Sequence, residues 1–141
     1  MCFFVCLALP QKFQAWSYID HSFEMIEVTD WSIGEATSGN GDRDRPFLVT
    51  AGGCSCFISA ASHRTQKSID EFESLVRSLL QQTPSLSMLI HYASGDISKE
   101  KVVRKDKRSV VFDEVWDQLN RLEPDVRYII TTQQRATATT S

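Results

Sequence analysis

The cysteines of this chain are the residues whose chemistry most invites a site. Cys54 and Cys56 form a C-x-C pair directly after Gly52 and Gly53, in the stretch TAGGCSCFI. On an extended strand their Cα atoms lie about 6.7 Å apart, at a rise of about 3.3 Å per residue. Two sulfurs on one tetrahedral zinc ion lie within about 4 Å of each other, since a Zn–S bond is about 2.3 Å long. We therefore predict no metal site and no cofactor, and we expect buried, unreactive thiols.

A thiol-dependent enzyme is the alternative interpretation of the same stretch. The backbone N–H groups beside the two glycines could stabilise a thiolate at Cys54 and hold an oxyanion. A nucleophile at Cys54 or Cys56 needs a histidine base within hydrogen-bonding distance. His63 is nearest in the sequence but lies in a polar connection, whereas His91 lies in an alternating pattern and faces either the core or a cleft. The sequence leaves it open whether the protein is an enzyme.

A basic segment offers a second kind of site. Residues 99–108, KEKVVRKDKR, carry six basic side chains against two acidic ones. The candidate anion-binding residues are Lys101, Arg104, Lys105, Lys107 and Arg108. They could hold phosphates, but the net charge of −3 and the lack of interleaved aromatic residues disfavour nucleic acid as the partner. The competing interpretation is a charged loop, or a solvated hairpin tip between two pairs of valines. The charges of this segment would then prevent sheet edges from associating with each other.

A polar stretch provides the third candidate. Residues 34–46, GEATSGNGDRDRP, contain almost nothing apolar and predict a loop. Trp31 stands at its root, where a large aromatic side chain anchors the loop or lines a pocket. Long loops often carry binding sites, so Trp31, Gly52 and Gly53 are the candidate ligand-binding residues. We rank first a binding or interaction module for a small ligand or a protein partner.

The apolar periodicity predicts the elements that position these residues. The continuous apolar run from Cys2 to Ala8 predicts a strand buried on both faces, inside a sheet. Capping residues at Ser68 and Glu71 and a helical apolar stripe predict a helix that ends before Pro84. The other predicted strands are 23–28, 47–50 continuing past a glycine bulge to 59, 86–92 and 126–132, and the other predicted helices are 13–19 and 112–122.

A chain of 141 residues fits one domain. We predict a single α+β domain over residues 1–132 and a frayed or disordered tail at 133–141. Its mixed or mostly antiparallel sheet has about five strands and two to three helices packed on it, in the order of a split βαββαβ unit plus one helix and one strand. The N-terminal apolar run is too short to cross a bilayer and has no basic flank, so we expect a cytoplasmic protein without membrane contact. A homodimer stays open, because small sheet domains often leave a strand edge unpaired.

Overall fold

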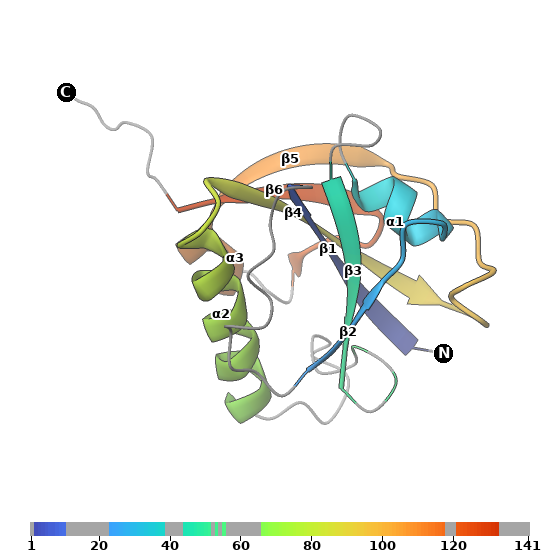
Figure 1. The fold of residues 1–141 in the computed structure, drawn as a ribbon, viewed down its shortest axis with the longest axis horizontal. Coiled ribbons are helices and arrows are strands. Elements are labelled where there is room, and N and C mark those ends of the chain that lie inside the picture. Colours follow the sequence, from blue (N-terminus) through green and yellow to red (C-terminus); the bar gives the residue numbers. More distant parts are fainter. Residues whose placement is uncertain are drawn as a thin grey trace.

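The computed structural model describes residues 2–10, 23–38, 44–51, 53, 55, 66–117 and 121–132. In these parts the chain forms a mixed six-stranded sheet and three helices (Figure 1). The predicted α+β architecture is confirmed, with one strand more than the sequence indicated. In chain order the elements are β1 (Cys2–Pro10), β2 (Glu24–Glu27), α1 (Ser32–Thr37), β3 (Asp44–Thr50), α2 (Gln66–Leu80), β4 (Ser85–Ala93), β5 (Asp106–Val111), α3 (Phe112–Asp117) and β6 (Val126–Thr131).

The sheet has the strand order β2-β3-β1-β4-β6-β5. Neighbouring strands are antiparallel except β5 and β6, which are parallel. It follows that β1 and β2 run parallel with β3 between them, and that β3 and β4 run parallel with β1 between them. Two interleaved pairs of this kind are what the split βαββαβ order predicts. The strands β6 and β5 extend this unit beyond β4.

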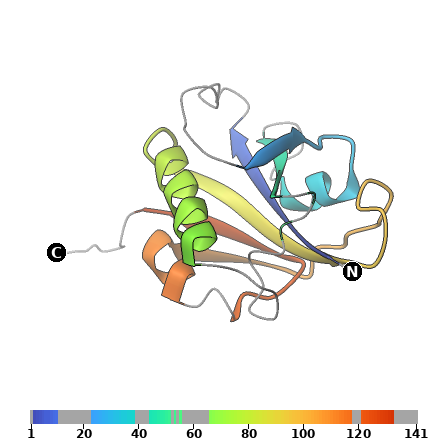
Figure 2. The same ribbon diagram turned by 90° about the horizontal axis from the view of Figure 1, so that it is seen from below.

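Both faces of β1 are buried, as the sequence predicts. Val5, Leu7 and Leu9 contribute to a core that also contains residues of α2 and α3. Phe4 and Cys6 point the other way, into a second core that contains residues of α1. Figure 2 shows α2 and α3 together at one side of the sheet and α1 away from them. We call the two sides the α2 face and the α1 face.

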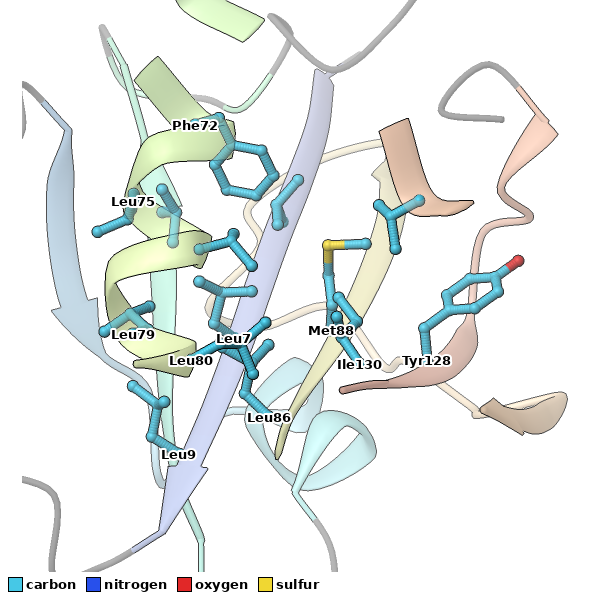
Figure 3. Packing of buried hydrophobic residues seen from close by; sticks show 14 of the residues in the cluster. Leu7, Leu9, Phe72, Leu75, Leu79, Leu80, Leu86, Met88, Tyr128 and Ile130 are labelled. Atoms are coloured by element: carbon cyan, nitrogen blue, oxygen red, sulfur yellow. The ribbon is translucent and has the colours of Figure 1, made fainter. Parts of the chain in front are cut away.

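The α2 face holds the larger core. Leu75 and Leu79 of the apolar stripe of α2 share this core with Leu7 of β1, Met88 of β4 and Ile130 of β6 (Figure 3). The helix starts at Gln66, two residues before the predicted cap. Burying each large aliphatic side chain contributes about 1.5–3 kcal/mol, so this stripe holds α2 in place.

The predicted loop at 34–46 is wrong at both of its ends. Residues Ser32–Thr37 form α1, and β3 already begins at Asp44. Ile33 and Thr37 are fully buried on the α1 face, although the surrounding sequence is polar and contains a glycine. Burial of Ile33 against the sheet outweighs the weak helix propensity of this stretch, because tertiary packing routinely overrides propensity.

The predicted charged loop at 99–108 is right for residues 99–105, which form neither helix nor strand, and wrong for the last three residues, whereas the alternative of a hairpin tip is wrong. Residues Asp106–Val111 form β5, which pairs in parallel with β6 at the edge of the described sheet. Val102 and Val103 form no opposing strand, since Val102 is buried against α1 residues and Val103 is 62% exposed. An edge strand has exposed side chains, so it tolerates charged residues that a central strand would not.

Three sequence predictions fall outside the described residues: the helix at 13–19, the strand continuation at 56–59 and the tail at 133–141. Within the described ranges, α3 ends at Asp117, and residues 118–120 of the predicted longer helix are not described. No helix in the described ranges is both long and apolar enough to cross a membrane.

Candidate functional site

The glycine-cysteine stretch is described only at Gly53 and Ser55; Gly52, Cys54, Cys56 and His63 lie outside the described residues. Gly53 has φ +94°, a conformation that favours glycine and fits a turn. Ser55 is fully buried, and its hydroxyl accepts a hydrogen bond from the Val5 N–H at 2.9 Å and donates one to the Val49 carbonyl. The middle residue of the C-S-C triplet therefore joins β1 to the end of β3.

The two described cysteines are free, with Cys6 buried and Cys2 half-buried. Burial raises the pKa of Cys6 to about 12, and hydrogen bonds to Thr37 and to the Phe47 backbone only partly offset it. A thiol of this kind is almost entirely protonated near neutral pH and is a poor nucleophile.

We expect Cys6 to resist alkylation by iodoacetamide near neutral pH in the folded protein and to react after unfolding in urea. Peptide mass spectrometry that compares labelling at Cys6 and Cys2 measures this difference directly. Labelling of folded Cys6 at the rate of a free thiol in solution would contradict its burial.

His91 is the one histidine in the described ranges, and both of its ring nitrogens are occupied. Its Nδ1 lies 2.6 Å from Oδ1 of Asp125 and its Nε2 lies 2.5 Å from Oε2 of Glu100. The side chain is 10% exposed. Burial by itself lowers the pKa of His91, but the hydrogen bonds and charges of the two carboxylates together raise it above the ordinary 6.5. A protonated imidazole that donates to two carboxylates fits this geometry.

This arrangement does not suit a catalytic base, because neither ring nitrogen has a free lone pair for a thiol or a substrate. The pKa of Glu100 is lowered, first by the hydrogen bond from His91 and further by the Ser94 backbone N–H. Within the described ranges no group of three His, Cys, Asp or Glu side chains could hold a metal ion. The cluster of His91, Glu100 and Asp125 therefore acts as a structural clamp.

The clamp fixes the basic connection, which we define as residues 99–105. Glu100 accepts further hydrogen bonds from the backbone N–H groups of Ser94 and Gly95. The Val102 N–H donates to Oγ of Ser32 at 2.7 Å. Farther along, the Lys105 N–H donates to the Asp125 carbonyl at 2.7 Å. Three separate attachments thus hold a segment whose composition alone indicates a charged loop.

Four of the five predicted anion-binding residues are available to a ligand. Their side chains are exposed, and none of them forms an ion pair with a residue in the described ranges; these four are Lys101, Arg104, Lys105 and Lys107. Arg108 differs, because it pairs with Glu123 at 2.7 Å and with Asp106 at 3.0 Å, and the hydrogen bond with Glu123 is the main cause of its raised pKa. Arg108 is therefore a structural residue.

Arg127 joins this group, and the sequence analysis missed it. It lies beside Lys107 in the pairing of β5 with β6, so both side chains point to the α1 face. The signal was present in VRYIIT, because Val126, Tyr128 and Ile130 fill the core on the α2 face and leave Arg127 on the opposite one. We name Lys101, Arg104, Lys105, Lys107 and Arg127 together the basic edge.

Comparisons with models of protein families, with curated proteins and with solved structures found no match. The function of the basic edge must therefore be inferred from its own geometry.

Trp31 belongs to the fold and not to the basic edge. It is half-buried and packs against the core on the α1 face. Its carbonyl accepts the first hydrogen bond of α1, from the Glu35 N–H at 3.1 Å. Of the two roles predicted for Trp31, the structure is consistent with the anchor.

Proposed function

We propose that the protein is a binding module that captures an anionic partner on the basic edge. One observation carries this proposal: Lys101, Arg104 and Lys105 are exposed and without ion-pair partners in the described ranges, and they sit on a connection that hydrogen bonds hold in place, with Lys107 following on β5. Elsewhere, Arg45 and Arg77 each pair with a glutamate. Unpaired positive charge gathered on one edge of a protein with net charge −3 creates a local field that attracts anions.

The attachments of the basic connection support binding more than simple solvation. A flexible basic loop loses conformational entropy when it takes up a ligand, which weakens its affinity. Here Glu100, Val102 and Lys105 are already held by hydrogen bonds in the free protein. The backbone that carries the cations between these points is therefore ordered before any ligand arrives.

Two alternatives have less support. A thiol enzyme would need Cys54 or Cys56 together with His63, since both nitrogens of His91 are engaged. A single-stranded nucleic acid would need aromatic side chains near the cations on which its bases could stack. Tyr92 is 44% exposed, but it stacks on Phe3 on the α2 face, away from the basic edge.

Location and assembly belong to the same proposal. Free thiols at Cys2 and Cys6 suit a reducing compartment such as the cytoplasm. The outer strands of the described sheet, β2 and β5, leave edges at which a second copy could pair. Light scattering on a gel-filtration column measures the mass of the particle, and a strictly monomeric mass at high concentration would rule out the dimer.

The test of the proposed function is binding of labelled polyglutamate and of a labelled oligonucleotide, followed by fluorescence anisotropy over a salt series. We expect polyglutamate to bind at low salt and to dissociate as salt rises, because the contacts are between charges. Changing Lys101, Arg104, Lys105 and Lys107 together to glutamine should weaken binding by about a hundredfold, roughly 2.7 kcal/mol.

The control variant is Lys67→Gln, which removes one exposed cation from α2 and should leave affinity within about twofold. The affinity of this control is compared with that of the single variant Lys107→Gln. Failure of both probes to bind at low salt would refute the proposed function, and tighter binding of the oligonucleotide would redirect it to nucleic acid.

A further inference from the structure

We infer that Arg127, Arg104 and Lys107 form a binding site for a phosphate monoester group on the α1 face. This inference rests on the proposed function and names the chemistry of the anion that the basic edge takes.

Arg127 is fixed in position but retains hydrogen-bond donors. Its Nε donates to Oγ of Ser87 at 3.0 Å, which orients the guanidinium, and its side chain is only 12% exposed. The nearest carboxylate, Asp44, lies 3.8 Å from a terminal nitrogen, beyond hydrogen-bonding distance. Within the described ranges the two terminal nitrogens therefore have no acceptor. A guanidinium offers these nitrogens to an oxyanion as a two-pronged donor.

Two observations relate the other cations, Lys107 and Arg104, to the guanidinium of Arg127. Lys107 is the residue that pairs with Arg127 across β5 and β6, so the two side chains lie next to each other on one face. Burial lowers the pKa of Arg127, Asp44 opposes this effect, and the charge of Arg104 lowers it further. The like charge of Arg104 beside a nearly buried guanidinium is unfavourable in the free protein. A bound oxyanion would reverse that repulsion.

The net charge of these side chains determines which kind of anion fits best. Within the described ranges, these three cations and the carboxylate of Asp44 together leave two net positive charges. A phosphate monoester carries nearly two negative charges at neutral pH, because its second pKa is about 6. A carboxylate, a sulfate ester and a phosphodiester carry one each. Ser109 pairs with Ile129 on the same face of β5 and is exposed, so its hydroxyl adds a donor for the third oxygen.

The experiment compares phenyl phosphate with phenyl sulfate, which has nearly the same shape but one negative charge less, by isothermal titration calorimetry at constant ionic strength. We expect phenyl phosphate to bind at least about tenfold more tightly, since tenfold is only about 1.4 kcal/mol. Arg127→Lys keeps the charge but loses the forked donor, so it should weaken binding of both ligands and leave most of the preference, whereas Arg104→Gln and Lys107→Gln each remove one charge and should reduce the preference. The control is Arg77→Lys, which alters an arginine of α2 and should change nothing.

Inorganic phosphate is the third probe and separates a free ion from an ester. Equal affinities for inorganic phosphate and phenyl phosphate would mean that the site binds the free ion and does not distinguish an ester from it. Should Arg127→Lys fail to fold, the exposed variants Arg104→Gln and Lys107→Gln test the same site. Equal binding of phenyl phosphate and phenyl sulfate, while polyglutamate still binds, would overturn this inference and leave the proposed function intact. Loss of all binding would refute both.

Discussion

Replacing Gly34 by alanine should lower the free energy of unfolding by about 3 kcal/mol, the upper part of the usual range for overpacking. A Cβ at this position would lie 2.0 Å from the carbonyl oxygen of Val28 and 2.9 Å from its carbonyl carbon. Both are backbone atoms and cannot rotate away. The Val28 carbonyl accepts the Trp31 N–H, and the Val28 N–H donates to the Pro46 carbonyl, so a shift of Val28 would strain both hydrogen bonds.

Urea unfolding followed by circular dichroism measures this effect, with Gly95→Ala as the matched control. A Cβ at Gly95 would meet no atom within 4 Å. We expect the control to stay within about 0.5 kcal/mol of the wild type, as exposed substitutions usually do. Equal stabilities for the two variants would show that α1 does not pack closely against Val28.

The second large effect should come from the clamp. Replacing His91 by leucine leaves the carboxylates of Glu100 and Asp125 without the cation that lies between them. Removing one partner of a fully buried charged pair costs about 3–5 kcal/mol, and since Glu100 and Asp125 are 19% and 25% exposed we expect a smaller loss of about 2 kcal/mol at pH 6. The loss should be accompanied by faster proteolysis of the basic connection, because the clamp is one of its three attachments.

The clamp also predicts how stability depends on pH. The raised pKa of His91 means that its contribution is complete below the ordinary value of 6.5 and is lost as the pH rises through the folded value. The lowered pKa of Glu100 means that its contribution is complete above 4.5 and is lost as the pH falls. The clamp should therefore stabilise the fold most between about pH 4.5 and pH 6.5.

His91→Gln separates this pH effect from other titrating groups, because His21 and His63 remain in both proteins. Between pH 6.5 and pH 9 the free energy of unfolding of the wild type should fall toward that of the variant. The difference between the two curves is the quantity to measure. A difference in the free energy of unfolding that stays constant over this pH range would contradict a protonated His91 between the two carboxylates.

The sequence predicted those elements whose apolar pattern is clear. The uninterrupted apolar run of β1 and the helical stripe of α2 gave both elements and their faces. The prediction failed for α1. Gly34 is needed there for the close approach to Val28, but glycine in a polar stretch also indicates a loop. It failed for β5 because the hydrogen bonds that make it a strand come from β6, about 20 residues later.

The candidate site was predictable only in part. The basic residues stand out by composition, but their grouping with Arg127 depends on which residue of β6 lies beside Lys107. The clamp shows the same limit, since Asp125 meets His91 across 34 residues and Glu100 meets it across nine. Such meetings are set by strand pairing and not by local spacing.

The central place of β1 has a consequence for synthesis of the chain. A ribosome completes β1 before either of its neighbours, and the second neighbour, β4, ends only at Ala93. At about 5–20 residues per second, a strand that is apolar on both faces waits roughly 4–17 s for its last partner. Both edges of β1 stay open until β3 is complete at Thr50, and the edge that β4 will cover stays open to other nascent chains for the whole interval. We therefore expect the yield of folded protein to depend on holdase chaperones more than its final stability suggests, and depletion of these chaperones in a cell-free translation system would test it.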